Sequence, residues 1–284
     1  MDQIDLRAYF DRIRYKNPGV PGATLETLEA LHALHPQAIP FENLDALLGR
    51  QVRLDLHSIQ QKLVAQGRGG YCFEHNLLFR SVLQTLGFKV GSFAGRVLWG
   101  RDAGLELPAR AHMVLVVKLG EQRFLTDVGF GGLTMSAPLL LETGIEQRTP
   151  HGAYRILDSE SEIETDGEGL PGFVLEAQID SCWLPVYRFD LDPQYQDDYE
   201  MKNHFVATHP ESLFVQNLLA ARLAPGRRLG LFNRAFRIHD ERRGTQKIEL
   251  PTVGDVLRTL AEDFGIALPG SPGELEAALS KLPT

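Results

Sequence analysis

Arg68-Gly-Gly-Tyr-Cys-Phe-Glu-His-Asn76 is the most informative segment of this sequence, because it predicts a glycine-rich turn that leads directly into a helix. The glycines permit a tight backbone entry, and apolar residues recur at helical spacing from Phe73 to Leu86. Cys72 is therefore expected in the first helical turn, where unpaired N–H groups and the helix dipole favour an anion. Such a thiolate is suited to nucleophilic attack, and the same N–H groups to holding an oxyanion. Free cysteines are also common as small core residues, so the interpretation depends on finding a base.

A histidine and an aspartate further along the chain are predicted to supply that base and its orienting partner. Residues 111–128 predict two buried strands joined by the two-residue turn Gly120-Glu121. With this turn Asp127 lies opposite Val114, and His112 shares the face of Val114 because strand side chains alternate. Diagonal neighbours on one face are within reach of a carboxylate–imidazole hydrogen bond, whereas a three-residue loop would separate them.

Cys72, His112 and Asp127 are thus the predicted catalytic triad. An aspartate among apolar strand residues is costly to bury unless a partner satisfies it, which favours the pairing with the histidine. The order Cys, His, Asp is also that of papain-like and transglutaminase-like enzymes. No metal is expected at the site.

Other candidates carry weaker signals. His75 lies three residues after Cys72 and is more typical of a packing residue, and His204 is a candidate substrate or cofactor contact for which a structural role is favoured. Cys182, beside Trp183 in a predicted strand, is interpreted as a core residue.

Two segments are candidate pocket walls. The turn that follows Asp127 contains Gly129, Phe130, Gly131 and Gly132, and its glycines allow backbone N–H groups to approach a ligand closely. The segment Pro40–Leu44, which includes Phe41, is a loop by default and a wall if the helices pack over the cysteine.

The pattern along the chain predicts an α+β fold in three parts. Residues 1–89 favour a helical bundle, with helices at Ile4–Tyr15, Leu25–His35, Ser58–Gln66 and Phe73–Leu86. Residues 90–190 favour closely spaced strands in an antiparallel sheet or small barrel. Residues 191–284 favour an α/β segment with a helix at Asp197–Ala207 and a strand at Phe214–Arg222. The acidic stretch Asp158–Glu168 is expected to be a solvated loop.

The composition and net charge of the chain exclude some classes of binding partner. The chain has 284 residues, 43% of them hydrophobic, and a formal net charge of −8, which argues against nucleic acid or an anionic membrane as the main partner. There is no apolar run long enough for a membrane span, and the acidic start is unlike a signal peptide, so a cytoplasmic protein is expected. Two cysteines far apart in the sequence are then independent thiols. The oligomeric state is not predicted.

The combination of motifs resembles the bacterial arylamine N-acetyltransferases. The segments that carry the resemblance are Arg68–Asn76, Ile39–Leu44, Ala111–Met113 and Thr126–Gly131, with further likeness at Tyr9–Ile13 and Thr208–Ser212. The resemblance implies a helical bundle, a β-barrel and an α/β lid. It also implies a ping-pong reaction in which acetyl-CoA acetylates Cys72 and an arylamine, arylhydrazine or N-hydroxyarylamine attacks the thioester. It gives Phe41 and Phe130 as aromatic pocket walls and puts the turn from Gly129 to Gly132 near the cofactor.

Three rival functions share the same residues. Proteins similar to this family use the triad as amide synthases that close a macrolactam from a polyketide thioester. A cysteine peptidase or transglutaminase-like hydrolase would use the same nucleophile with a peptide groove. A binding protein with a vestigial triad is disfavoured, because all three residues are present.

Overall fold

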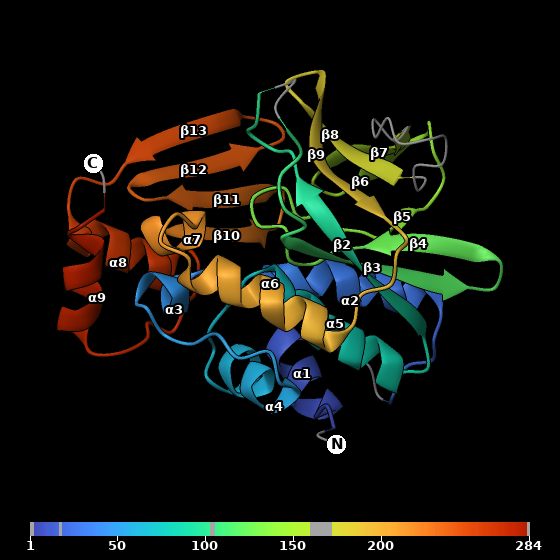
Figure 1. Cartoon of the computed structure of the whole chain (residues 1–284), viewed down its shortest axis with the longest axis horizontal. Helices are drawn as coiled ribbons and strands as arrows, with labels where there is room; N and C mark the ends of the chain where they lie inside the picture. Colours follow the sequence, from blue (N-terminus) through green and yellow to red (C-terminus); the bar gives the residue numbers. More distant parts are fainter. Residues whose placement is uncertain (1–2, 17–18, 103–105, 160–171, 283–284) are drawn as a thin grey trace.

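The first helices of the chain gather on one side of the molecule and share one hydrophobic core (Figure 1). The computed structural model describes residues 3–16, 19–102, 106–159 and 172–282. These helices are α1 (Leu6–Ile13), α2 (Leu25–Ala38), α3 (Leu44–Leu47), α4 (Leu56–Ile59), a π-helical segment η1 (Gln60–Ala65) and α5 (Cys72–Thr85). The helix predicted at Ser58–Gln66 begins earlier, at Leu56, because the Asp55 side chain accepts the backbone N–H of Ser58 and so caps the helix.

The middle of the chain forms an eight-stranded antiparallel sheet that curls into a nearly closed barrel. Its strands are β2 (Lys89–Val97), β3 (His112–Leu119), β4 (Gln122–Thr126), β5 (Leu139–Leu140), β6 (Glu146–Thr149), β7 (Gly152–Ser159), β8 (Gly172–Ile179) and β9 (Cys182–Asp190). Their order is β5-β4-β3-β2-β9-β8-β7-β6. The Gln147 side chain joins the two edge strands, donating to Leu140 O at 2.9 Å and accepting from Leu140 N at 2.8 Å. The predicted β-barrel is confirmed.

Strand β3 lies between two hydrophobic cores, and this position determines the face of the sheet on which His112 lies. Its odd-numbered residues Met113, Leu115 and Val117 pack with the helices, whereas Val114 and Val116 pack inside the barrel. His112 has the parity of the barrel-facing residues. The register Leu119↔Gln122 confirms the two-residue turn predicted for this hairpin.

The last part of the chain contributes a second sheet with helices beside it. This sheet has the order β1-β10-β11-β12-β13, formed by β1 (Phe41–Glu42), β10 (Leu219–Ala224), β11 (Arg227–Phe232), β12 (Ala235–Asp240) and β13 (Gly244–Glu249). The helices are α6 (Gln196–Thr208), α7 (Leu213–Gln216), α8 (Val253–Glu262) and α9 (Pro272–Leu279). In Figure 1, α8 and α9 lie at the end of this sheet, and α6 runs across α5.

Three predictions about the fold need correction. The strand predicted at Phe214–Arg222 is helix α7 followed by β10, because Ser212 accepts the N–H of Phe214 and caps a short helix. The loop predicted around Phe41 is strand β1, which pairs with β10. Cys182 is exposed and not a core residue, because it begins β9 directly after a turn with positive φ at Ser181.

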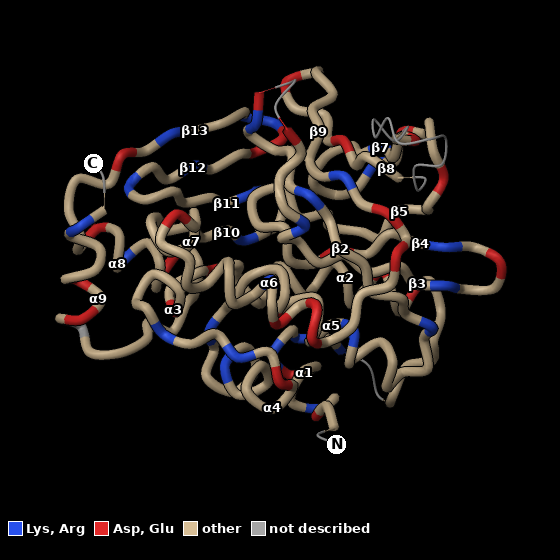
Figure 2. The backbone as a smooth tube through the Cα atoms, viewed as in Figure 1, with Lys and Arg blue, Asp and Glu red and all other residues tan. Residues whose placement is uncertain are grey.

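The boundaries predicted after residues 89 and 190 stay predictions, and most of the acidic stretch Asp158–Glu168 lies outside the described residues. No helix among the described ranges is long and apolar enough to cross a membrane. Figure 2 shows Lys and Arg positions interspersed with Asp and Glu positions along most of the tube, including strands β11–β13.

Candidate active site

Cys72 is the first residue of α5, and a tight turn places it there. Gly69 allows that turn, because a Cβ at this position would lie 2.0 Å from the Pro40 carbonyl oxygen. Glu74 Oε2 accepts the backbone N–H of Tyr71 at 3.0 Å, which fixes the residue before the helix. The cysteine is 4% exposed, and its thiol points toward the Ala111 carbonyl at 3.8 Å, at the start of β3.

His112 and Asp127 lie in direct contact beside this thiol. The imidazole Nε2 is 2.7 Å from Asp127 Oδ2, which leaves Nδ1 as the ring nitrogen available to the cysteine. Burial lowers the pKa of His112, but the charge and hydrogen bond of Asp127, with a smaller contribution from Cys72, outweigh burial and raise it to about 10. The structure therefore brings the three predicted catalytic residues together, with the imidazole held as a cation.

The Asp127 carboxylate is itself held by several donors. Its Oδ1 accepts from Asn76 Nδ2 at 3.0 Å and from the backbone N–H of Gly129 at 2.9 Å. Asn76 also donates to Met113 O and accepts the backbone N–H of Val128, so α5 is tied to both strands of the hairpin. Burial raises the pKa of Asp127, whereas His112 and these hydrogen bonds lower it below its ordinary value. The carboxylate is thus kept ionised and in one orientation.

The turn after Asp127 packs directly on the nucleophile helix. A Cβ at Gly129 would lie 2.9 Å from His75 Cβ and 3.0 Å from Cys72 Cα, distances that side chains do not tolerate. Glycine here lets the backbone touch α5 between Cys72 and His75. This contact places the turn beside Cys72, and its predicted position near the cofactor stays a prediction.

Aromatic rings surround the triad. Phe130 lies edge-on to His112 with ring centroids 5.2 Å apart, and Tyr187 is 5.0 Å from the same ring. Phe41 stacks parallel to His75 at 6.4 Å, and Phe214 meets Phe41 edge-on at 5.9 Å. These contacts put Phe130 against His112 and Phe41 against His75, and both are predicted wall residues.

A second group of buried histidines lies behind the nucleophile and forms a directed chain. Tyr9 OH is 2.9 Å from His35 Nδ1, His35 Nε2 is 2.9 Å from His75 Nδ1, and His75 Nε2 is 3.2 Å from Pro40 O. The Pro40 carbonyl only accepts, so His75 Nε2 must donate to it. In a neutral ring His75 Nδ1 then accepts from His35, and His35 Nδ1 accepts from the Tyr9 hydroxyl.

Burial keeps this chain neutral. It lowers the pKa of His75 to about 4 and that of His35 well below its ordinary value, and it raises the pKa of Tyr9. His32 is a further buried histidine whose pKa burial lowers to about 4, and its Nε2 accepts the backbone N–H of Asp127 at 3.3 Å. His75 is therefore a positioning residue that connects the nucleophile helix to the backbone next to Phe41.

Buried ion pairs fix the base of the site. Arg68 contacts Glu42 at 2.7 Å, and Lys62 lies 2.7 Å from both Glu74 and Asp45. These contacts join the glycine-rich turn, strand β1 and the first turn of α5. Because removing one member would leave a buried charge without its partner, the network favours a single arrangement of the turn.

Two side chains attach the predicted pocket walls to the last third of the chain. Arg228 on β11 donates to the carbonyl oxygens of Gly132 and Thr134 at 3.2 and 2.9 Å. Asn43 donates to Phe214 O and Asn217 O, both at 2.7 Å. Both segments that border the nucleophile are thus attached to the last third of the chain.

The remaining predicted contacts are less closely placed. His204 is an exposed residue of α6, and its role as a substrate or cofactor contact stays a prediction. Gly131 has φ +94° and lies against the Phe41 ring, whereas a Cβ at Gly132 would meet nothing within 4 Å.

Sequence reasoning missed several residues that support the site. Asn76 and the histidines His32 and His35 gave no signal of their own, because their partners are 26 to 95 residues distant along the chain. Tyr187 was hidden in a strand, although its ring contacts His112 and Phe130. The recurrence of histidine at 32, 35 and 75 among apolar helix residues was the available hint.

Comparison with known proteins gives the same picture over almost the whole length. A family model described as N-acetyltransferase matches residues 24–272. The arylamine N-acetyltransferase of Mycobacterium tuberculosis strain H37Rv is 40% identical over 284 residues, covering 98% of this chain and 96% of the relative. A Salmonella typhimurium protein named arylamine N-acetyltransferase / N-hydroxyarylamine O-acetyltransferase is 39% identical over 264 residues, 93% of this chain and 89% of its own. The structure of Mycobacterium marinum arylamine N-acetyltransferase in complex with CoA matches with a TM-score of 0.90 and 41% identity, covering 98% of this chain and 99% of that one.

Proposed function

This chain belongs to the arylamine N-acetyltransferase family and is an arylamine N-acetyltransferase, and we propose that Cys72 carries the acetyl group as a thioester between acetyl-CoA and the acceptor. The observation that supports this role is the contact of His112 with Asp127 at 2.7 Å beside the thiol at the start of α5. Cys72 is the nucleophile in this proposal, His112 the base and later the acid, and Asp127 the residue that orients the imidazole.

The proposed first half-reaction follows from this geometry. The thiol proton is held on His112 Nδ1, where Asp127 stabilises the imidazolium, and Cys72 Sγ attacks the acetyl carbonyl carbon of acetyl-CoA. The new bond joins Sγ to that carbon, the carbon–sulfur bond of the donor breaks, and the CoA sulfur leaves as a thiol with the proton returned by His112. Backbone N–H groups at the start of α5 are suited to stabilise the oxyanion.

The proposed second half-reaction transfers the acetyl group to an amine. The acceptor nitrogen attacks the thioester carbonyl, gives its proton to His112, and releases the Cys72 sulfur. An aromatic acceptor suits a site bordered by Phe41 and Phe130. Exclusion of water by these rings protects the thioester from hydrolysis until the amine arrives.

The acceptors in this proposal are arylamines, arylhydrazines and N-hydroxyarylamines. The name of the Salmonella relative includes O-acetyl transfer to N-hydroxyarylamines, which supports the last class. The structure of a relative in complex with CoA supports acetyl-CoA as the donor.

The test is an intact-mass measurement in two steps. Incubation with acetyl-CoA should add one acetyl group to the wild-type chain, and addition of an arylamine should remove it. Cys72→Ser should take up no acetyl group. Cys182→Ser is the matched control, because it removes the exposed second cysteine and should behave as the wild type.

Three outcomes would contradict the proposal. They are the absence of an adduct, an adduct that persists in Cys72→Ser, and an adduct lost as fast without amine as with it. The last result would indicate a hydrolase.

A further inference from the structure

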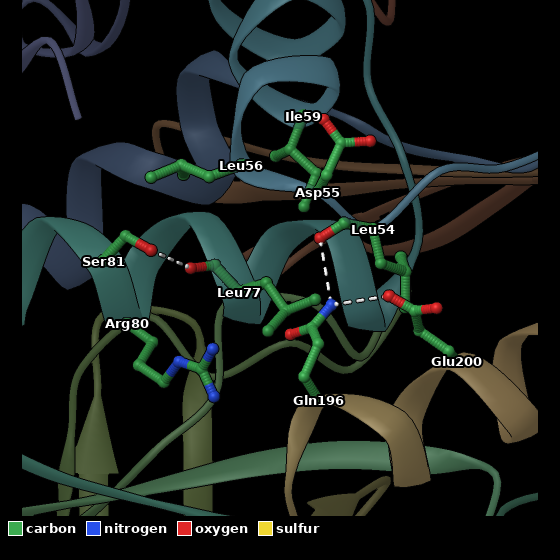
Figure 3. Close-up of a pocket in the computed structure, with 9 residues that line it drawn as sticks. All are labelled: Leu54, Asp55, Leu56, Ile59, Leu77, Arg80, Ser81, Gln196 and Glu200. Carbon is green, nitrogen blue, oxygen red and sulfur yellow. Dashed lines mark hydrogen bonds between the residues drawn. The ribbon is translucent and has the colours of Figure 1, made fainter. Parts of the chain in front are cut away.

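A cavity of about 200 Å³ lies between α4, α5 and α6, away from the residues around the triad. Figure 3 shows Arg80 of α5 and Gln196 of α6 on one side of it, with Leu56 and Ile59 of α4 on the other. None of the triad residues and neither Phe41 nor Phe130 lines it. It is therefore a second concave site that the acetyl-transfer reaction does not use.

The cavity wall contains a guanidinium whose hydrogen bonds are incomplete. Arg80 Nη1 donates to Ser92 Oγ at 3.2 Å, the Nε atom is buried without an acceptor, and Nη2 forms no hydrogen bond with the described residues. Burial lowers the pKa of Arg80, and its one opposing influence is Tyr199 and not a carboxylate. A buried guanidinium charge without a paired carboxylate is costly, and a bound anion would offset that cost.

Two carboxylates line the same cavity, and each already has other partners. Asp55 accepts from Ser58 N at 2.9 Å and pairs with Arg53 at 2.9 Å. Glu200 Oε1 accepts from Gln196 Nε2 at 3.3 Å. Neither forms an ion pair with Arg80 within the part of the chain that the structure describes, so its guanidinium charge has no fixed counter-ion.

The remaining walls define the body of a ligand. The side chains of Leu54, Leu56, Ile59 and Leu77 are apolar and line the cavity. An apolar cavity of about 150 Å³ is large enough to hold benzene, so this one has room for such a ring with one small substituent. A carboxylate oxygen is a strong acceptor for a guanidinium N–H, so Nη2 is the group of Arg80 that would hold the carboxylate of such a ligand.

We propose that this cavity binds a small monocarboxylate whose apolar body is about the size of a benzene ring, with its carboxylate on Arg80 and its ring against Leu56, Ile59 and Leu77. A phosphate or sulfate ion would use the guanidinium but not the apolar walls. A neutral aromatic compound would use the walls but leave the guanidinium without its acceptor.

The test is a titration of the full chain with 4-fluorobenzoate, followed by ¹⁹F NMR, with 4-fluorobenzamide as the neutral isostere. Binding of the benzoate should saturate, and Arg80→Gln should weaken it by about tenfold or more, because a charge-assisted hydrogen bond is lost. The benzamide should bind more weakly than the benzoate and be insensitive to Arg80→Gln. Leu56→Phe, which fills the cavity and keeps the guanidinium, should also weaken benzoate binding.

Acetylation of Cys72 by acetyl-CoA is measured on both variants to show that they are folded, and it should match the wild type. Benzoate affinity that is unchanged in both variants, or equal for benzoate and benzamide, would overturn the proposal. Binding that disappears when Cys72 is acetylated would also overturn it, since the ligand would then occupy the acetyl-transfer site. The binding readout does not depend on transfer, so its failure is distinguishable from failure of the proposed function.

Discussion

His112 and a group of three other buried histidines lie around the same helix, yet His112 is a cation and the other three are neutral. His112 is paired with Asp127, and its pKa is raised to about 10. His32, His35 and His75 are equally buried, and burial lowers their pKa values, to about 4 for His32 and His75. His32 meets Asp127 through its backbone N–H and not through its carboxylate.

The difference teaches that the atom a histidine meets decides its charge at equal burial. A carboxylate oxygen favours the imidazolium, whereas a carbonyl, a tyrosine hydroxyl or another imidazole can be satisfied by the neutral ring. A protonatable base and a fixed neutral support are thus built from one residue type around Cys72.

The largest expected effect on the rate of acetylation comes from removing the charge that keeps His112 protonated. Asp127→Asn keeps the shape of the side chain but removes its charge, and we expect the rate of Cys72 acetylation to fall by about 10⁴-fold. Stopped-flow measurement of CoA release checks this rate. Glu176→Gln is the control, because Glu176 is a partly buried carboxylate that pairs with Arg155 and not with a histidine. Turnover near the wild-type level would show that Asp127 is not the orienting residue.

The neutral group should appear as acid sensitivity of folding. Unfolded histidines take up protons near pH 6.5, whereas the folded His32 and His75 stay neutral down to about pH 4, and burial also lowers the pKa of His35 well below its ordinary value. The free energy of unfolding should therefore decrease as the pH is lowered through this window, by up to about 4 kcal/mol per pH unit for three groups. The His112 contribution has the opposite sign: it is complete below about pH 6.5 and lost as pH rises toward about 10.

Urea unfolding at a series of pH values measures this slope. His32→Leu should reduce it by about a third, since one of three protons is removed. The exposed His57→Gln serves as control and should leave it unchanged. A slope that His32→Leu does not alter would mean that His32 is already protonated in the folded chain.

The contact between the two groups can be disturbed at Gly129. Gly129→Ala puts a Cβ 2.9 Å from His75 Cβ and 3.0 Å from Cys72 Cα, so the turn must move away from α5. We expect a loss of about 3 kcal/mol in the free energy of unfolding and slower acetylation of Cys72. Gly132→Ala is the matched control, because a Cβ there meets nothing within 4 Å. Equal effects of the two substitutions would contradict the close approach at Gly129.

The smallest expected effect is at the far end of the neutral chain. Tyr9→Phe removes the donor to His35 Nδ1 and should lower the free energy of unfolding by about 1 kcal/mol, with little change in the acetylation rate. Chemical denaturation and the same CoA-release assay measure the two quantities. Tyr195→Phe, at an exposed position, should change neither. A large loss of activity in Tyr9→Phe with normal stability would indicate that the chain takes part in proton transfer.

Local rules predicted the parts of the site that lie close together in the sequence. The start of α5 at Cys72 follows from glycines and helical spacing, and the pairing of His112 with Asp127 follows from a two-residue turn. Both depend on backbone geometry over fewer than twenty residues. The strand pattern also predicted an antiparallel sheet or small barrel, and the family resemblance added the lid and the reaction as expectations.

Contacts between distant segments could not be predicted in the same way. Strand β1 is too short to show a period, and its partner β10 lies in a region where an Asn- and Ser-capped helix was mistaken for a strand. The tautomers of His35 and His75 depend on Pro40 and Tyr9, which no spacing connects. Cys182 looked like a core residue because its neighbours are apolar, whereas its position beside a turn exposes it.

The pairing of Phe41 with Ala221 also constrains how the protein can be made. Synthesis runs from the N-terminus, so the reactive thiol leaves the ribosome while the strand that will hold Phe41 has no partner. Asn43 is likewise synthesised before Phe214 and Asn217, whose carbonyl oxygens accept its hydrogen bonds. A nascent chain therefore carries Cys72 before strand β1 has its partner, and one halted before residue 219 would have the cysteine without the pairing of β1 with β10.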